Sequence, residues 1–132
     1  MESTLSTKTR RCIAVVDDEL IVREALSSLL RAAGYRVVLF ASGEDFLQST
    51  SVYLPDCVLV DCTMLGLSGL EVVSRLVAEQ LDIPAIVIAA GTDEALEKKA
   101  IDAGARALLR KHIRAEHLFA AIDAALADRT GP

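Results

Sequence analysis

Residues 57–69 read CVLVDCTMLGLSG, and this stretch decides how the rest of the chain is interpreted. Four apolar residues of strand character, 57–60, end at a single carboxylate, Asp61, and turn-forming residues follow before the next helical pattern begins. We therefore predict that Asp61 stands at the carboxyl end of a buried strand. In an open α/β sheet this is the edge where ligands bind, although taken alone such an aspartate is better explained as a turn or helix-capping residue.

Apolar runs alternate with helical patterns along the whole chain. The predicted strands are 12–16, 35–40, 57–60, 85–89 and 105–110, and the predicted helices are 19–33, 42–48, 68–80, 92–104 and 114–127, with Ser42 and Thr92 as caps. In the helix over 68–80, the side chains expected to point inward are Leu70, Val73, Leu76 and Val77. This alternation, without repeats, predicts a single doubly wound sheet of five strands and five helices, with the short, more polar last strand at an edge.

Composition limits the class of protein. The chain has 132 residues, 52% of them hydrophobic and only 4% aromatic, which suits helices packed on a parallel sheet. A net charge of -5 argues against nonspecific binding to nucleic acid or to anionic lipid. No apolar stretch near 18 residues indicates a membrane span, and no signal peptide is present. Cys12, Cys57 and Cys62 have no metal-ligand spacing and are interpreted as reduced thiols of a cytoplasmic protein.

Residues 1–10, rich in Ser and Thr, are predicted to be a disordered lead-in, residues 11–127 to form one domain, and residues 128–132 to be a tail. The Met-led start and short tail favour a stand-alone protein, with an excised domain as the alternative.

Two acidic residues, Asp17 and Asp18, follow the first predicted strand. The carboxyl ends of strands one and three share a crevice in such a sheet, so we expect Asp17, Asp18 and Asp61 to converge. Clustered carboxylates repel one another, and a divalent cation is the simplest way to keep them ionised. Oxygen ligands without histidine favour Mg²⁺ or Mn²⁺ over Zn²⁺. Lys111, after strand five, can reach the same crevice, and this set of groups suits phosphoryl transfer to an aspartate.

With these residues in place, the chain resembles the receiver domain of two-component response regulators over residues 11–127. The resemblance is carried by VVDDE at 15–19, Asp61 with Met64 and Gly69 behind it, Pro84, AGA at 103–105 and Lys111. The stretches SGEDFL at 42–47 and PDCVLVD at 55–61 look most like the receivers that carry helix-turn-helix output domains. The resemblance implies a flavodoxin-like (CheY-like) fold with strand order 2-1-3-4-5.

The resemblance also implies roles for individual residues. Asp61 would accept phosphate from a histidine kinase or a histidine phosphotransfer protein. Asp18, Asp61 and the backbone carbonyl of Thr63 would bind Mg²⁺ directly, and Asp17 would act through water. Lys111 would hold a phosphate oxygen. Such a domain is a phosphoacceptor with at most slow self-dephosphorylation, not an enzyme.

Four positions depart from the family pattern. Ala89 stands where Thr or Ser usually follows the phosphate, and alanine has no hydroxyl to donate. Leu108 replaces the usual Tyr or Phe of strand five, and Leu65 and His112 occupy positions where Pro is usual. The Lys111–His112 peptide is therefore trans, or cis at a cost of roughly 3 kcal/mol. We expect complete acceptor chemistry with a weak or unconventional conformational switch.

Several functions remain open at this stage. The main prediction is a signalling domain that acts by contact with a downstream protein, by passing phosphate on, or as a phosphate sink. A receiver-fold interaction module that does not switch is the second hypothesis, and homodimerisation is not decided. A haloacid-dehalogenase-type phosphatase would need a second acid where Thr63 stands, and a flavin phosphate would be repelled by DDE at 17–19. His112 and His117 are interpreted as surface or boundary residues, with pH sensing as a remote alternative.

Overall fold

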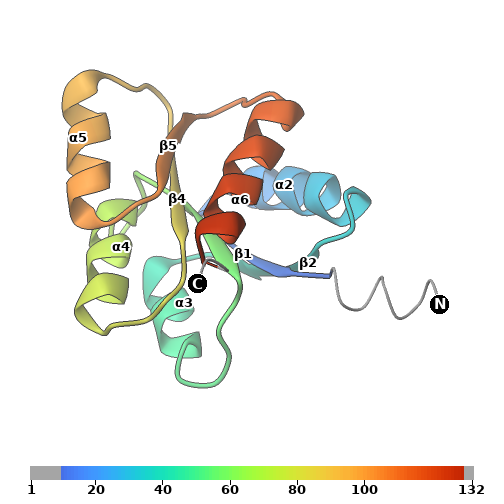
Figure 1. Cartoon of the computed structure of the whole chain (residues 1–132). Helices are drawn as coiled ribbons and strands as arrows, with labels where there is room; N and C mark the ends of the chain where they lie inside the picture. Colours follow the sequence, from blue (N-terminus) through green and yellow to red (C-terminus); the bar gives the residue numbers. More distant parts are fainter. Residues whose placement is uncertain (1–9, 130–132) are drawn as a thin grey trace.

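The computed structural model describes residues 10–129 as a sheet covered by helices on both faces (Figure 1). In chain order the elements are β1 (Cys12–Val16), α2 (Leu20–Ala32), β2 (Arg36–Phe40), α3 (Gly43–Ser49), β3 (Cys57–Asp61), α4 (Gly69–Ala78), β4 (Ala85–Ala89), α5 (Glu94–Ala103), β5 (Ala107–Arg110) and α6 (Ala115–Arg129). The strands are all parallel, in the order β2-β1-β3-β4-β5, so the predicted fold and the edge position of β5 are confirmed.

The core has two apolar layers, one on each face of the sheet. Helices α2 and α6 cover one face, and α3, α4 and α5 cover the other (Figure 1). Along β1 the side chains alternate between these layers: Ile13 and Val15 face α2 and α6, whereas Ala14 and Val16 face the other three helices. Because both faces are covered, β1, β3 and β4 are buried throughout, which explains their uninterrupted apolar sequences.

Two details of the predicted helices were wrong. The cap of α5 is Asp93, whose carboxylate accepts a hydrogen bond from the backbone N–H of Leu96 at 2.8 Å, and not Thr92. Val77 is 56% exposed, and Val72 is buried in its place. The buried stripe of α4 is narrower than predicted, and Val77 lies on its flank, beside Gly104 at the end of α5.

The ends of the chain bear on the predicted domain limits. Helix α6 continues to Arg129, two residues beyond the predicted helix end, and the prediction of a disordered lead-in falls almost entirely on residues outside those described. Gly104 ends α5 with a positive φ of 117°, as a glycine stop signal predicts. No helix within residues 10–129 has the length and apolar character needed to cross a membrane.

Candidate functional site

Three carboxylates meet at the carboxyl edge of the sheet. Asp17 and Asp18 follow β1, and Asp61 ends β3, the strand that pairs with β1. Each offers an oxygen, and these oxygens all lie within 4.8 Å of one another. Asp17 and Asp61 are each only 3% exposed, whereas Asp18 is exposed to solvent. The parallel pairing of β1 with β3 is what brings residues 44 positions apart into one cluster.

Backbone N–H groups of the neighbouring loops bind each carboxylate. Oδ1 of Asp17 accepts from Glu19 at 2.9 Å, and Oδ1 of Asp61 accepts from Thr63 at 3.3 Å. Oδ2 of Asp18 accepts from the N–H of Leu65 at 3.2 Å, which ties the loop after β3 to the loop after β1. The charges are thus partly compensated by the backbone, and the carboxylates are held in place.

Lys111 brings a positive charge to the cluster. Its backbone N–H donates to the carbonyl oxygen of Ala89 at 2.7 Å, which aligns the end of β5 with the end of β4. Its Nζ lies 3.4 Å from Oδ2 of Asp61 and 3.2 Å from Oε1 of Glu19. Sequence reasoning assigned no role to Glu19, although its position two residues after Asp17 marked it as a member of the same edge.

Burial is the largest influence on the pKa of Asp61 and of Asp17. Removal from water raises the pKa of Asp61, while the Thr63 N–H and the ammonium of Lys111 lower it, and the net shift is upward. Burial also raises the pKa of Asp17, and the charge of Asp61 adds to that rise. For Lys111 burial lowers the pKa, but the carboxylates of Asp61 and Glu19 outweigh it, so the pKa is raised and the ammonium stays charged at neutral pH.

The start of α4 lies directly against the end of β3. A Cβ on Gly69 would overlap the carbonyl oxygen of Asp61 and come within 3.0 Å of the Cα of Cys62. Gly69 also donates its N–H to the carbonyl oxygen of Cys62 at 3.0 Å. Ser68 caps this helix in a reciprocal arrangement with Glu71, which fixes where the helix begins. Only glycine permits this close approach of helix and strand.

The donor set fits a hard divalent cation. Two oxygens bound directly to Mg²⁺ at about 2.1 Å can be at most about 4.2 Å apart. The carboxylate oxygens here lie within 4.8 Å of one another, so the spacing suits direct binding by some of them and binding through water by another. A search of the described residues for His, Cys, Asp and Glu side chains close enough to share a metal ion finds this cluster. All of its ligand atoms are carboxylate oxygens, which suit Mg²⁺. The role predicted for the carbonyl of Thr63 stays a prediction.

Three of the four substituted positions, Ala89, Leu65 and His112, end or follow the strands at this edge, whereas Leu108 lies within β5 opposite Val87 of β4. Ala89 ends β4 and is 4% exposed, while Leu108 is half-buried against the core layer that faces α4 and α5. Leu65 is 85% exposed in the loop after Asp61. The Lys111–His112 peptide is trans, because no described peptide bond is cis, and His112 adopts a positive φ of 63°. His112 and His117 are exposed, in agreement with their interpretation as surface residues.

The fold and this cluster define a class of protein. The family described as "Response regulator receiver domain" matches residues 13–123, so the chain belongs to the receiver domains of response regulators.

Relatives and solved structures give the same class. The chain is 40% identical over 114 residues to "Response regulator protein TmoT" of Ectopseudomonas mendocina, covering 86% of this chain and 52% of the relative. It is 33% identical over 118 residues to "Transcriptional regulatory protein FixJ" of Bradyrhizobium diazoefficiens, covering 89% of this chain and 58% of the relative. The crystal structure of FixJ-N superposes with a TM-score of 0.83 at 28% identity, covering 90% of this chain and 96% of that one. The chain spans about half the length of these curated relatives.

Proposed function

We propose that this chain accepts a phosphoryl group on Asp61 in a Mg²⁺-dependent reaction and passes the signal on by contact with another protein. The observation that carries the proposal is the position of Asp61, which ends β3 between the carboxylates of Asp17 and Asp18 on one side and the ammonium of Lys111 on the other. A buried carboxylate paired with a lysine is suited to nucleophilic attack on phosphorus, because the charge of the transferred group is balanced from two directions.

The step is a displacement at phosphorus. One carboxylate oxygen of Asp61 forms a bond to phosphorus, and the bond from phosphorus to the donor breaks, releasing the imidazole of a phosphohistidine or the acetate of acetyl phosphate. The Thr63 N–H and Lys111 Nζ contact different oxygens of Asp61, which orients the carboxylate before the donor arrives. Lys111 is then placed to bind an oxygen of the transferred group.

Asp17 and Asp18, together with Asp61 and the carbonyl of Thr63, are the groups that we assign to Mg²⁺, with Asp17 acting through water. Bound there, Mg²⁺ neutralises negative charge on the phosphoryl oxygens. The hydrogen bond from the Leu65 N–H to Oδ2 of Asp18 competes for one of these ligands, so metal binding is expected to alter the loop after β3.

A partner that delivers phosphate has to approach this edge of the sheet. Exposed apolar side chains surround it, with Ile21 81% exposed, Leu20 57% and Leu65 85%. Between α2 and the start of α6 there is a mainly apolar cavity of about 300 Å³ that Lys111 also lines. We assign this surface to the histidine kinase or histidine phosphotransfer protein that carries the phosphohistidine, because a donor seated here has its phosphoryl group next to Asp61.

Incubation with acetyl phosphate and Mg²⁺ tests the acceptor function. The chain is expected to gain the mass of one phosphoryl group and to shift on a phosphate-affinity gel, and EDTA is expected to prevent both changes, because the repelling carboxylates then have no cation between them and the donor. Equal modification in EDTA would contradict the metal requirement. No modification with Mg²⁺ at saturating donor would favour the alternative of a receiver-fold interaction module.

The switch is expected to be weak. Ala89 cannot donate a hydrogen bond to a phosphoryl oxygen, and Leu108 has no ring to move inward. Beryllofluoride with Mg²⁺ mimics the phosphoryl group. When it fills the site, we expect changes in the amide NMR shifts of the loop after β3. The changes in the amide shifts of α5 are expected to be small. Large shifts throughout α5 would contradict this prediction and assign the chain a conventional conformational response.

A further inference from the structure

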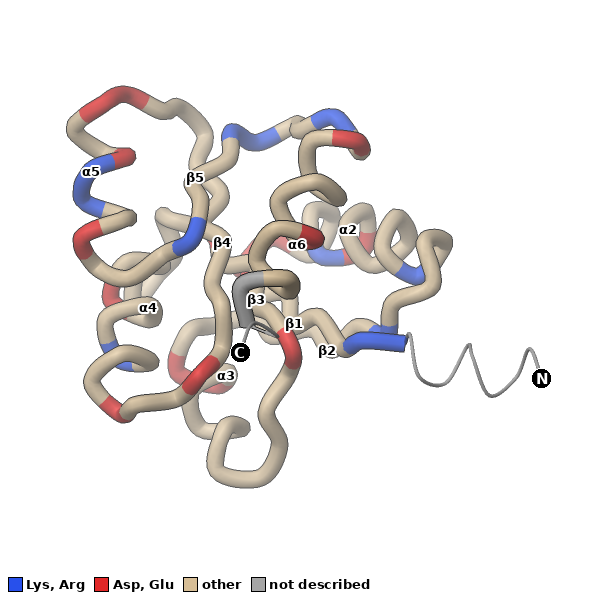
Figure 2. The backbone as a smooth tube through the Cα atoms, viewed as in Figure 1, with Lys and Arg blue, Asp and Glu red and all other residues tan. Residues whose placement is uncertain are grey.

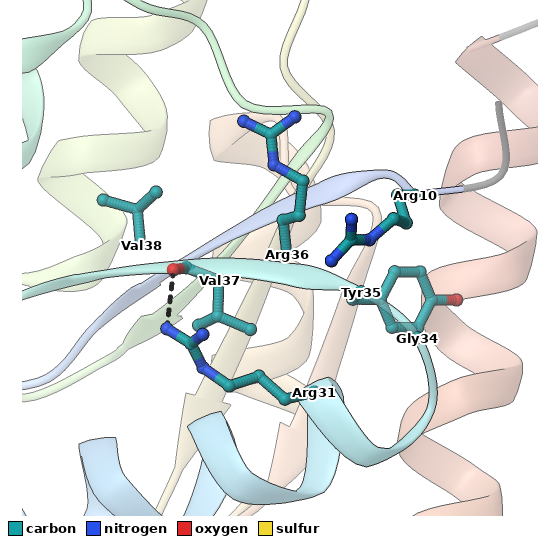
Figure 3. Close-up of a pocket in the computed structure, with 7 residues that line it drawn as sticks. All are labelled: Arg10, Arg31, Gly34, Tyr35, Arg36, Val37 and Val38. Carbon is teal, nitrogen blue, oxygen red and sulfur yellow. Dashed lines mark hydrogen bonds between the residues drawn. The ribbon is translucent and has the colours of Figure 1, made fainter. Parts of the chain in front are cut away.

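A polar hollow lies at the amino edge of the sheet, where β1 and β2 begin, away from the acidic cluster. Its volume is about 360 Å³, and Figure 3 shows the residues that line it: Arg10, Arg31, Gly34, Tyr35, Arg36, Val37 and Val38. Because the strands are parallel, the beginning of β2 and the end of β3 stand at opposite edges of the sheet. This hollow is therefore separate from the site around Asp61.

The hollow is positively charged in an acidic chain. Three guanidinium groups line it and no Asp or Glu does, while the whole chain has a net charge of -5. Figure 2 shows Lys and Arg at the start of β1 and β2. Asp56, whose carboxylate accepts from the N–H of Cys12 at 2.8 Å, is an acidic residue at the same edge, but it does not line the hollow. The three guanidinium groups therefore make this hollow a place to which an anion is attracted.

Arg31 is held in place without a ligand. Its Nε donates to Oγ of the buried Ser27 at 2.9 Å, and its Nη2 donates to the carbonyl oxygen of Val37 at 3.2 Å (Figure 3). These two bonds fix the guanidinium against the open edge of β2 and leave further N–H donors available. The rotamer entropy of this arginine is thus already lost in the free protein.

Arg10 and Arg36 differ from Arg31, because neither guanidinium has a hydrogen bond or ion pair to another residue within 10–129. The N–H of Arg36 donates to the carbonyl of Arg11 at 2.9 Å, which places the segments that carry the two side chains next to each other. Figure 3 shows the side chains of Arg10 and Arg36 on one side of β2 and that of Arg31 on the other, with the guanidinium groups of Arg10 and Arg36 apart from each other. Guanidinium groups that line one hollow without a partner among residues 10–129 favour the binding of an anion.

The backbone adds a donor. Arg36 donates its N–H to the segment before β1, and the carbonyl of Phe40 accepts from Asp17, so alternate residues of β2 direct their backbone groups toward β1. The residues between them direct theirs to the open edge, since β2 is the last strand of the sheet on that side. The N–H of Val37 is one of these groups, and Val37 lines the hollow.

We propose that this hollow binds a small phosphate-type anion, with Arg10 and Arg36 as the principal ligands and Arg31 and the edge of β2 as support. Planar guanidinium groups match phosphate oxygens in pairs, and several of them favour a group with two or more negative charges. A volume of about 360 Å³ is at the lower end of the range for small-molecule sites, which favours a compact anion. The carboxylate of Asp123 accepts a hydrogen bond from the hydroxyl of Tyr35, a residue that lines the hollow, at 3.3 Å. Asp123 itself does not line the hollow, so its negative charge does not occupy the proposed anion site.

Titration of ¹⁵N-labelled protein with pyrophosphate in EDTA tests the proposal. Saturable amide shifts are expected at residues 34–38. Arg10→Gln and Arg36→Gln are each expected to weaken binding about tenfold, as loss of one charge-assisted contact implies, and the double variant is expected to abolish the shifts. Arg75→Gln, which removes an exposed arginine of α4, is the matched control and is expected to bind as the parent does. Thermal unfolding verifies that each variant is folded.

Two outcomes would overturn the proposal. Undiminished shifts at 34–38 in the folded double variant would show that the arginines are not the ligands, and shifts confined to the loop around Lys111 would assign the anion to the acidic edge instead. Vesicles containing phosphatidylglycerol present the same chemistry from a lipid source. The chain is expected to stay in the supernatant, because its net charge of -5 opposes an anionic surface. Co-sedimentation that the double variant abolishes would assign the hollow to a lipid headgroup and refute a small-molecule ligand.

Discussion

Asp61→Asn is expected to abolish phosphorylation by acetyl phosphate, even at a donor concentration and incubation time that modify the parent chain completely. An amide is not a nucleophile toward phosphorus under these conditions, and Asp61 is the carboxylate at the centre of the cluster, 3.4 Å from Lys111. Intact-protein mass spectrometry and a phosphate-affinity gel measure the loss. A phosphoryl group retained by Asp61→Asn would refute the assignment of the acceptor.

Asp102→Asn is the matched control. Asp102 is an exposed carboxylate of α5 that pairs with Lys98 at 3.3 Å on the surface, and its replacement is expected to leave phosphorylation unchanged. Foldedness of Asp61→Asn is verified by thermal unfolding in EDTA. Burial raises the pKa of Asp61, so the ionised carboxylate is unfavourable in the metal-free fold, and removing its charge is expected to raise the unfolding midpoint. An unfolding midpoint below the temperature of the assay would mean that lost folding explains the lost activity.

Gly69→Ala is expected to lower the free energy of unfolding by about 2 to 4 kcal/mol, a large effect for one methyl group. The new Cβ would overlap the carbonyl oxygen of Asp61 and lie 2.9 Å from its carbonyl carbon, and these backbone atoms cannot move without disturbing β3. Urea unfolding followed by circular dichroism measures the change. The displaced strand end carries Asp61, the proposed acceptor, so slower phosphorylation is expected as well.

Gly91→Ala tests whether the effect comes from the clash. A Cβ on Gly91 would meet no atom within 4 Å, and we expect a change within about 1 kcal/mol. Alanine is more favourable than glycine in a helix by about 1 kcal/mol. Without a clash, Gly69→Ala at the first turn of α4 would therefore raise the free energy of unfolding. A Gly69→Ala chain as stable as its parent would contradict the close approach of α4 and β3.

The secondary structure was largely predictable because its signals are local. The apolar runs over β1 and β4 were predicted with the bounds that the structure shows, and Ser42 caps α3 as expected, by accepting from Asp45 at 3.1 Å. The cap of α5 was missed because Thr92 and Asp93 are adjacent and both can cap. Backbone conformation selects between them, and Asp93 has the extended φ and ψ of a capping residue.

The candidate site was predictable in its members but not in its contacts. Strand-end positions were enough to expect Asp17, Asp18, Asp61 and Lys111 at one edge, because parallel strands end together. The ion pair of Lys111 with Glu19 and the bond from Leu65 to Asp18 were not predicted, since they depend on rotamers and on the path of the loop after β3. The 2.7 Å bond from Arg23 Nη1 to the carbonyl of Asp17 was missed for the same reason.

The order of apolar runs, turn residues and strand-end charges along the chain determined by itself a doubly wound sheet with acids at its carboxyl edge, because each of these signals acts within a few residues or follows from parallel pairing. Three features could be known only from the tertiary structure. They are the close contact that requires glycine at position 69, the face of α4 that is buried, and the hollow lined by Arg10, Arg31 and Arg36. Those features come from contacts between segments far apart in the chain, and residue periodicity carries no information about the distances between them.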